Sequence, residues 1–433
     1  MQTPFFLSNG LIFPDHWLHF QNKDAHMKSP KSFRLHIGLF GRRNSGKSSI
    51  LNALTNQEVS IVSEIAGTTT DPVEKPMELL PIGPVLFIDT AGIDDTGELG
   101  QQRISRTFSV FDRTDLGIIV TNYSTWGEYE HTIMGEFRKR DIPFVVVFNK
   151  VDLYPENLDI VSQLESLKIG NVATDAFHRE GIDKLRLLLL DKAPADFVNR
   201  QAILADLVGP GEMAVLVTPI DKEAPKGRLI LPQVQSIRDL LDHGAFCLVV
   251  REHELENALQ RLTIPPKLIV TDSQAFEMVN AITPPEIPLT SFSILFARFQ
   301  ADLSEMVRGA MTIDRLKPGD KVLIAEACTH HPIEEDIGTV KIPNWLNKYV
   351  GGPLVFENMR GRDFPKNLED YKLVIHCGAC MWNRREMLGR IMKAKEAGVP
   401  ITNYGLTIAY SLGIFARALE PFPAALEWVN GKQ

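Results

Sequence analysis

Short apolar runs alternate with segments of helical periodicity along most of the chain. Such runs are typical of strands that are buried on both faces of a sheet. The runs predict strands at residues 35–40, 85–89, 144–149, 214–217, 227–233, 245–250, 267–270, 292–299, 321–325, 372–375 and 400–402. Helical periodicity predicts helices at residues 182–190, 234–241, 384–396 and 406–418. Because strands and helices alternate, the fold class is expected to be α/β with parallel sheets.

The length of 433 residues is too great for one hydrophobic core, so several domains are expected. Residues 1–33 are rich in aromatic side chains but have no hydrophobic period, and we expect a disordered, dispensable extension, or a working start at Met27. A first domain is predicted at 34–196 and a second at 200–287. A proline-dense stretch precedes the third, at 288–433.

Net charge, the length of the apolar runs and the distribution of cysteines exclude some classes of protein. The net charge of −8 gives no basic field for nucleic acid, so no nucleic-acid partner is expected. Apolar runs all fall well short of the ~20 residues that span a bilayer, so no membrane partner is expected either. Three of the four cysteines cluster late in the chain, which is unlike a disulfide framework and indicates a reducing compartment, the cytoplasm.

A phosphate-binding loop follows the first predicted strand. Residues 41–48 read GRRNSGKS, a complete G-x-x-x-x-G-K-S sequence that opens a helix. In such loops backbone amides surround phosphate oxygens, the lysine neutralises the β- and γ-phosphates, and the serine ligates Mg²⁺. The predicted nucleotide-binding residues here are Gly41, Asn44, Ser45, Gly46, Lys47, Ser48 and Ser49.

Further motifs occur in the order that a GTPase requires. Thr69 lies in a threonine run suited to a first switch, where it would contact Mg²⁺ and the γ-phosphate. Asp89 ends a strand, and Gly92 follows three residues later with a backbone amide for the γ-phosphate. The residues expected to act in catalysis are Lys47, Thr69, Asp89 and Gly92.

A guanine-reading motif follows at Asn149, Lys150 and Asp152. A carboxylate at Asp152 can accept hydrogen bonds from N1 and from the exocyclic amine of guanine, and adenine has no such pair of donors. The nucleotide is therefore predicted to be GTP. Asp175 and Ala176 stand where a last loop would contact the base oxygen, although Asp175 replaces the usual serine.

The late cysteines form a candidate metal site. Cys328 and His330 follow one predicted strand, and His376, Cys377 and Cys380 end another. Ligands of open α/β sheets bind beyond the carboxyl ends of strands, so the two groups are expected to meet there. Zinc would take four of these ligands, whereas an iron–sulfur cluster would use three thiolates and leave one position open. Residue chemistry leaves both metals, and a chance grouping of core cysteines, open.

The nucleotide motifs resemble those of the GTPases related to the tRNA-modification GTPase TrmE and to Era. The resemblance implies slow, Mg²⁺-dependent hydrolysis that K⁺ stimulates, with Asn44 helping to hold the K⁺. Ile93 stands where Ras-like proteins keep the glutamine that positions water, so hydrolysis cannot use that residue. Asp94, Asp95 and Glu98 are weak candidates for orienting the water.

Taken together, the GTPase motifs, residues 225–235 (PKGRLILPQVQ) and the Cys-x-His and His-Cys-x-x-Cys motifs resemble HydF, the GTPase and scaffold of iron–iron hydrogenase maturation. The resemblance implies a P-loop GTPase domain, a small α/β dimerisation domain that forms a homodimer, and a carboxyl-terminal α/β iron–sulfur domain. It implies a 4Fe-4S cluster on Cys328, Cys377 and Cys380, with His330 or His376 as fourth ligand or supporting group. A transient di-iron precursor would be assembled with two radical-SAM maturases and delivered to apo iron–iron hydrogenase.

Two other functions compete with this interpretation. A GTPase of RNA modification or ribosome assembly could carry the cysteines as a structural zinc site, but no basic and aromatic platform for RNA is apparent. A redox sensor could use Cys377 and Cys380 as a dithiol, which leaves Cys328, His330 and His376 without roles.

Overall fold

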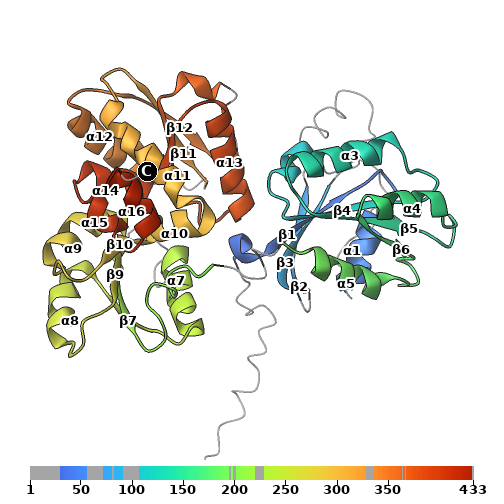
Figure 1. Ribbon diagram of the computed structural model, residues 1–433, viewed down its shortest axis with the longest axis horizontal. Helices are drawn as coiled ribbons and strands as arrows, with labels where there is room; N and C mark the ends of the chain where they lie inside the picture. The colour runs from blue at the N-terminus through green and yellow to red at the C-terminus, as the bar shows by residue number, and fades with distance from the viewer. Residues whose placement is uncertain are drawn as a thin grey trace, which may run out of the picture.

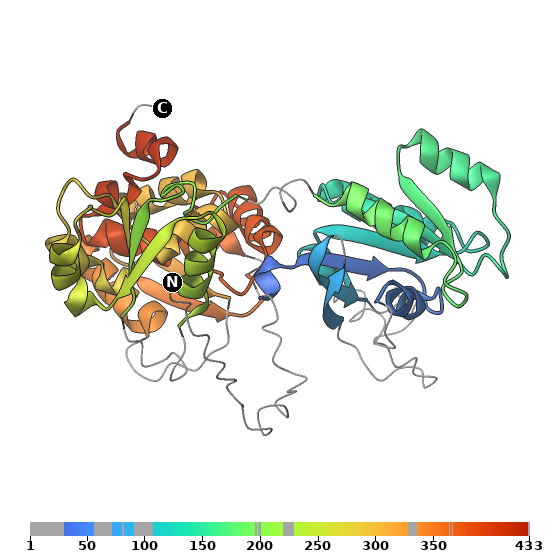
Figure 2. The ribbon, with the colours of Figure 1, turned by 90° about the horizontal axis from the view of Figure 1, so that it is seen from below.

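The computed structural model describes residues 30–55, 72–79, 82–90, 107–194, 197, 201–219, 229–327, 336–362, 364–365 and 367–431. Its strands form three sheets, one with six strands and two with four. We call the three parts built on them the amino-terminal, middle and carboxyl-terminal units. The amino-terminal unit lies to one side, and the other two units lie together on the other side (Figures 1 and 2).

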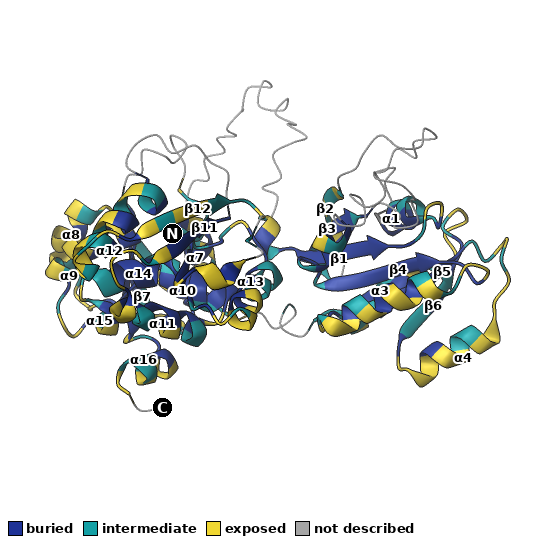
Figure 3. Cartoon of the chain, turned by 90° about the horizontal axis from the view of Figure 1, so that it is seen from above, coloured by how far each residue is buried: buried dark blue, intermediate teal, exposed yellow. Residues whose placement is uncertain are grey.

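The amino-terminal unit has the strand order β2-β3-β1-β4-β5-β6, in which β2 alone is antiparallel to its neighbour. Its strands are β1 Leu35–Phe40, β2 Val73–Leu79, β3 Gly83–Asp89, β4 Leu116–Thr121, β5 Phe144–Asn149 and β6 Gly170–Thr174. Its helices include α1 Lys47–Thr55, α3 Glu128–Lys139, α4 Leu158–Ser166 and α5 Ile182–Lys192. Every residue of β1 and β4 is buried, because apolar cores cover both faces of the sheet (Figure 3).

The middle unit is a parallel sheet with the order β10-β9-β7-β8. Its elements are β7 Met213–Val217, α7 Leu231–Asp242, β8 Phe246–Val250, α8 Leu255–Arg261, β9 Leu268–Thr271, α9 Phe276–Ile282, β10 Leu289–Ser291 and α10 Phe292–Gln300. Strand β10 follows the proline-dense stretch yet pairs with β9, so this sheet extends past the boundary expected at residue 287. Strand β8 forms one edge of the sheet.

The carboxyl-terminal unit is a second parallel sheet, ordered β12-β11-β13-β14. Its elements include α11 Leu303–Met311, β11 Lys321–Glu326, α12 Ile342–Val350, β12 Val355–Arg360, β13 Leu373–His376, α13 Arg384–Glu396, β14 Ile401–Asn403, α14 Tyr404–Ser411, α15 Phe415–Leu419 and α16 Pro423–Val429. One apolar core runs through this unit and the middle unit, from Leu216 through Phe296 to Val374. The two units are therefore held together by hydrophobic burial.

Three of the element predictions are wrong. Residues 292–299 form helix α10, which begins where the Ser291 side chain accepts a hydrogen bond from the Ile294 amide; nearly all of its side chains are buried, so it has no polar face for periodicity to detect. Residues 406–418 form two helices, because Gly413 adopts φ +72° between them. The expected strand at 227–233 runs into α7, which begins at Leu231 with a proline in its first turn.

Within the described ranges, no helix is long and apolar enough to cross a membrane.

Candidate functional site

The phosphate-loop sequence connects β1 to α1, as predicted, and packs closely on the strands beside it. Gly46 has φ +95°, and a Cβ atom added there would lie 2.1 Å from Asn149 Nδ2. Gly41 has φ +156°, and its added Cβ would lie 2.2 Å from the Val120 carbonyl oxygen. Both positions therefore require glycine, which lets the loop backbone approach a ligand closely.

Lys47 and Ser48 are oriented toward the nucleotide side of the loop by short polar contacts. Lys47 Nζ donates to the carbonyl oxygens of Gly41 and Arg42, both at 2.9 Å. Ser48 Oγ donates to Asp89 Oδ2 at 3.1 Å, so the last residue of β3 meets the first turn of α1. Burial raises the pKa of Asp89, and the Lys47 charge opposes that effect.

Two buried oxygens at this loop lack a hydrogen-bond partner. They are Ser45 Oγ and Asp89 Oδ1. An unsatisfied buried polar atom costs free energy, so native proteins usually give it a partner, a water or an ion. A hydroxyl beside the phosphate amides and a carboxylate oxygen beside Ser48 fit a phosphate and Mg²⁺, respectively. The chain's own residues therefore suit the expected nucleotide and metal.

The guanine-reading residues are brought to the same edge of the sheet. Asn149 Nδ2 donates to the Ser45 carbonyl oxygen at 3.3 Å, and Asn149 Oδ1 accepts from the Ala176 amide at 3.1 Å. Lys150 Nζ donates to the Asn44 carbonyl oxygen at 2.9 Å. Asn149 thus joins the phosphate loop to the last loop, while the Asp152 side chain two residues beyond Lys150 is exposed.

Asp175 stabilises the turn of the last loop, which explains why a carboxylate can replace the usual serine there. Asp175 Oδ1 accepts from the amides of Phe177 and His178, at 2.9 and 3.1 Å. Its other oxygen pairs with His178 Nδ1. That hydrogen bond lowers the pKa of Asp175 and raises the pKa of His178. The loop is therefore held in a turn that presents Ala176 toward Asn149.

An ion pair with a fully buried carboxylate, which no motif in the sequence predicts, supports the phosphate loop from the side. Arg42 Nε and Nη2 donate to the two oxygens of Glu130 at 3.0 and 3.1 Å. Glu130 also accepts from the Gly127 amide and from the Thr121 hydroxyl, and it is fully buried. Glu130 lies almost ninety residues along the chain from Arg42, and no spacing in the sequence indicates that the two meet.

At the cysteine site, register places the ends of the strands side by side. Glu326 pairs with Arg360, and His376 lies between Ala325 and Asn403. All four strands are parallel, so their carboxyl ends form one edge, as predicted. Residues 403–405 contribute to the same edge.

Cys377 sits at this edge with its sulfur in a hydrogen bond. The Ala327 amide donates to Cys377 Sγ at 3.1 Å, and the Cys377 amide donates to the Ala325 carbonyl oxygen at 2.9 Å. Ala379 has φ +49°, so the chain between Cys377 and Cys380 makes a left-handed turn. Ala327 directly precedes Cys328, so the segment leading to Cys328 passes the Cys377 sulfur.

Several expected site residues lie outside the described residues: Thr69, Gly92, Cys328 and His330. No cluster of three or more histidine, cysteine or acidic side chains suited to a metal occurs among the residues that are described. Cys377 and Cys380 are both half-buried at the strand edge. Thiolate sulfurs receiving backbone N–H donors are suited to a soft metal or an iron–sulfur cluster.

His376 is fully buried, and both of its ring nitrogens are engaged. Arg390 Nη1 donates to Nε2 at 2.8 Å, and Nδ1–H donates to the Cys377 carbonyl oxygen at 2.8 Å. Burial, together with the Arg390 charge, lowers the pKa of His376 to about 3, so the ring is neutral. This arrangement suits His376 to supporting the cysteine loop rather than to ligating a metal.

Glu326, which stands two residues before Cys328 in the sequence, is a buried carboxylate at the same edge. Glu326 Oε1 accepts from Tyr404 Oη at 3.1 Å, and Glu326 Oε2 accepts from Arg360 Nε at 2.7 Å. Burial raises the pKa of Tyr404, and the nearby Cys377 and Glu326 charges raise it further. Tyr404 is therefore a neutral hydrogen-bond donor beside the cysteine site.

Three family models match the chain. Residues 203–301 match the hydrogen maturase F dimerization domain, and residues 304–421 match the hydrogen maturase F tetramerization domain. The chain belongs to the hydrogen maturase F (HydF) family. Residues 36–150 match the 50S ribosome-binding GTPase family, so the amino-terminal unit of this HydF protein is a GTPase domain.

Proteins similar to the GTPase domain include tRNA modification GTPases, which are not named as HydF proteins. The tRNA modification GTPase MnmE of Bacillus mycoides is 34% identical over 157 residues, covering 35% of this chain and 33% of that protein. The MnmE of Nitrosomonas europaea is 35% identical over 162 residues, covering 36% and 34%. The chain therefore spans about a third of the length of these relatives.

Solved structures are similar over part of the chain. Era of Aquifex aeolicus bound to GDP and AlF4⁻ has 18% identity and a TM-score of 0.32, covering 57% of this chain and 97% of that one. The G domain of the T. maritima FeoB iron transporter has 21% identity and a TM-score of 0.30, covering 37% and 99%. These scores are too low to carry an argument about this chain.

Proposed function

We propose that this HydF protein is a GTP-hydrolysing scaffold. It binds a 4Fe-4S cluster through Cys328, Cys377 and Cys380, carries a di-iron precursor made with two radical-SAM maturases, and delivers that precursor to apo iron–iron hydrogenase. The observation that carries the proposal is the hydrogen bond from the Ala327 amide to the Cys377 sulfur, within a region that matches a HydF-specific domain. This contact brings the chain entering Cys328 beside the other cysteine motif.

The chain's own residues divide the work between two sites. In the GTPase domain Lys47 holds phosphate charge, while Ser48 and Asp89 lie together where Mg²⁺ would be held, with Thr69 as a further ligand. Asn44 is the proposed contact for K⁺. At the other site a bound cluster would supply an iron with an exchangeable position, and the chain shields it with half-buried cysteines at the strand edge.

Two single substitutions test this division. Lys47→Ala is expected to abolish GTP hydrolysis and leave iron content unchanged, since Lys47 belongs to the GTPase domain and donates to the Gly41 and Arg42 carbonyl oxygens of the phosphate loop. Cys377→Ser is expected to lower iron content and leave hydrolysis intact. If either change removed both properties, the two sites would not be independent and the proposal would fail.

Metal content and low-temperature EPR test the cluster itself. Protein reconstituted without oxygen is compared with a variant in which Cys328, Cys377 and Cys380 are all replaced by serine. About four irons per chain, with a reduced-cluster signal that the variant lacks, supports the proposal. A tightly held zinc without an iron signal would make the cysteines a structural clasp and refute the scaffold function.

The RNA-modification alternative rests only on the GTPase domain, which is the part that MnmE shares. The other half of the chain matches HydF domains, so we do not propose an RNA partner.

We also propose that homodimers form through the middle unit at the edge strand β8. Phe246 and Val249 on β8 are 63% and 39% exposed, and Leu241 on the adjoining α7 is 60% exposed. An exposed apolar edge strand is suited to pairing with another chain. Phe246→Glu should shift sedimentation toward the monomer, whereas Leu158→Glu, at an equally exposed leucine on α4 of the GTPase domain, should not. Equal sedimentation of the two variants would argue against β8.

A further inference from the structure

Helix α13 carries a buried arginine that the proposed function does not yet use. Arg390 donates from Nη1 to His376 Nε2 and from Nη2 to the Gly361 carbonyl oxygen, each at 2.8 Å. Its guanidinium lies 4.2 Å from the Trp382 ring centroid and 4.7 Å from that of Phe364. The guanidinium group is therefore held by two hydrogen bonds and two aromatic rings. The ammonium group of a lysine could not reproduce this arrangement.

The hydrogen bond from Arg390 fixes the tautomer and the orientation of the His376 ring. Because Arg390 donates to Nε2, the ring proton must lie on Nδ1, and that N–H reaches the Cys377 carbonyl oxygen. Trp382 packs against the same ring, with centroids 5.4 Å apart. The backbone at Cys377 is thus fixed through one histidine, whose tautomer is set from helix α13.

We propose that Arg390 is a positioning residue for the cysteine site: by fixing the tautomer of His376 it holds the Cys377 loop in the geometry that retains the cluster. This inference rests on the proposed function. Groups that orient metal-site residues from outside the ligand set commonly change metal affinity by about 10- to 100-fold when mutated.

The test compares Arg390→Met and Arg390→Lys with Arg384→Met, a control on the same helix. Arg384 donates to the carbonyl oxygens of Phe299 and Ala301, whereas the donor to His376 is Arg390. After reconstitution, Arg390→Met is expected to lose iron to a chelator about 10- to 100-fold faster than the control. Arg390→Lys keeps the charge but not both hydrogen bonds, so its rate of iron loss should lie between those of Arg390→Met and Arg384→Met.

A second measurement separates this role from the cluster. In the iron-free protein, ¹⁵N NMR of histidine should show His376 as the Nδ1–H tautomer in the parent and Arg384→Met, and a changed tautomer signal in Arg390→Met. If the parent protein took up no iron, the scaffold function would fail, yet this spectrum would still test Arg390. An unchanged His376 signal, or iron loss equal to the control, would overturn the positioning role.

The start of α13 makes an independent contact with the GTPase domain. Asn383 Oδ1 caps the helix by accepting from the Glu386 amide at 3.1 Å. Asn383 Nδ2 donates to the Arg113 carbonyl oxygen at 3.0 Å and to the Asp115 carboxylate at 3.1 Å. One side chain thus joins the helix that follows Cys380 to the turn that precedes β4.

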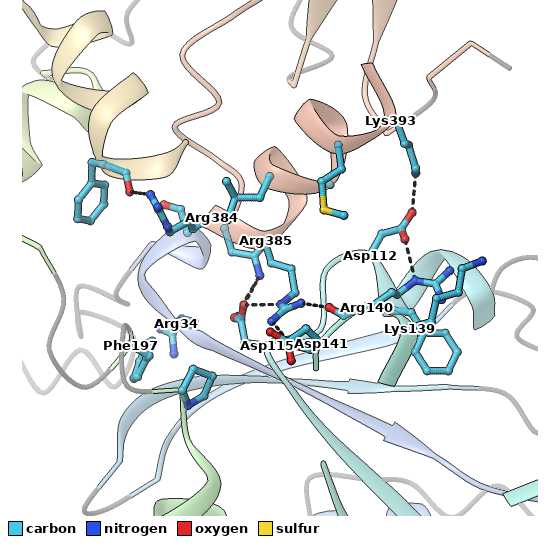
Figure 4. A pocket seen from close by; sticks show the side chains of 18 of the residues that line it. Arg34, Asp112, Asp115, Lys139, Arg140, Asp141, Phe197, Arg384, Arg385 and Lys393 are labelled. Atoms are coloured by element: carbon cyan, nitrogen blue, oxygen red, sulfur yellow. Dashed lines mark hydrogen bonds and ion pairs between the residues drawn. The ribbon is translucent and has the colours of Figure 1, made fainter. Parts of the chain in front are cut away.

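Further polar contacts surround this one, beside an aromatic contact between Phe33 and Phe299, whose ring centroids lie 5.3 Å apart. Arg385 donates to the carbonyl oxygens of Arg140 and Asp141, and Lys393 pairs with Asp112 at 2.8 Å (Figure 4). A cavity of about 640 Å³ lies among these residues. Interfaces of this kind permit domains to separate, unlike the continuous apolar core that joins the middle and carboxyl-terminal units.

We infer that this contact is a separable joint through which the GTPase domain acts on the start of α13 and hence on the cysteine loop. Asn383→Asp keeps an oxygen to cap the helix but places a second carboxylate about 3 Å from Asp115, so it should open the joint. The double variant D115N/N383D restores one amide and one carboxylate and should close it. Asn157→Asp makes the same change at the cap of α4, away from the joint.

Hydrogen exchange of the full-length protein, with GDP and with a non-hydrolysable GTP analogue, tests the joint. Asn383→Asp should speed amide exchange at residues 384–388, while N157D and D115N/N383D should match the parent. The two nucleotides should give different exchange at 384–388 in the parent and equal exchange in Asn383→Asp. Failure of the double variant to restore exchange, or equal exchange of the parent with both nucleotides, would overturn the joint.

Discussion

Because Glu130 is the buried partner of Arg42, we predict that Glu130→Gln lowers the stability of the GTPase domain. Each oxygen of Glu130 accepts two hydrogen bonds: Oε1 from Arg42 and Thr121, and Oε2 from Arg42 and Gly127. A glutamine amide has only one oxygen, so in either orientation its NH2 group faces one of the two Arg42 donors. The variant also removes the charge that compensates Arg42.

The size of the effect follows from these contacts. Breaking an ion pair whose carboxylate is fully buried costs about 3–5 kcal/mol. The Arg42 side chain is 32% exposed and can turn toward water, which places the expected loss at the low end, about 3 kcal/mol. For a domain of this size that corresponds to a melting temperature about 6–12 °C lower.

Urea unfolding of the full-length protein, followed by tryptophan fluorescence, to which Trp126 of the GTPase domain contributes, measures the change. Glu128→Gln is the matched control, because Glu128 lies on the same helix and is exposed. GTP affinity should also fall in Glu130→Gln but not in Glu128→Gln, since Arg42 belongs to the phosphate loop. If the two variants unfolded within about 0.5 kcal/mol of each other, the account of the buried pair would be wrong.

Two further predictions concern stability and pH. In Gly309→Ala the added Cβ would lie 1.9 Å from the Ile401 carbonyl oxygen, so unfolding should become easier by up to about 3 kcal/mol; Gly389→Ala, which meets no atom within 4 Å, should be neutral or slightly stabilising, and equal denaturation midpoints would contradict this. Because Asp175 raises the pKa of His178, the stability that their ion pair contributes is fully present below about pH 6.5 while Asp175 is ionised, and it is lost as pH rises through the raised value. An NMR titration should show the His178 pKa falling toward its ordinary value in Asp175→Asn, and an unchanged titration would exclude the contact.

Much of the nucleotide site could be predicted from the sequence because its parts are local. The phosphate loop is eight consecutive residues, and the elements around it follow one another along the chain. The strand β1 and the helix α13 have the bounds that the hydrophobic pattern predicted, since each has a clear polar boundary. The cysteine motifs were likewise assigned to strand ends, because parallel strands finish at one edge.

The hydrophobic pattern failed to predict two elements, for opposite reasons. Helix α10 is apolar nearly all round, so its sequence resembles a buried strand. Strand β12 lies at a sheet edge with several exposed positions, and it had no apolar run to reveal it.

By itself, then, the sequence determined the GTPase class of the first domain and predicted which residues would hold phosphate, guanine and a soft metal. Only the tertiary structure decided which distant groups support them. Glu130 meets Arg42, Arg390 meets His376, and Asp115 meets Asn383 through chain crossovers that no local spacing encodes. These contacts depend on strand order and on burial, where hydrogen bonds must be satisfied, and both arise only when the whole chain has folded.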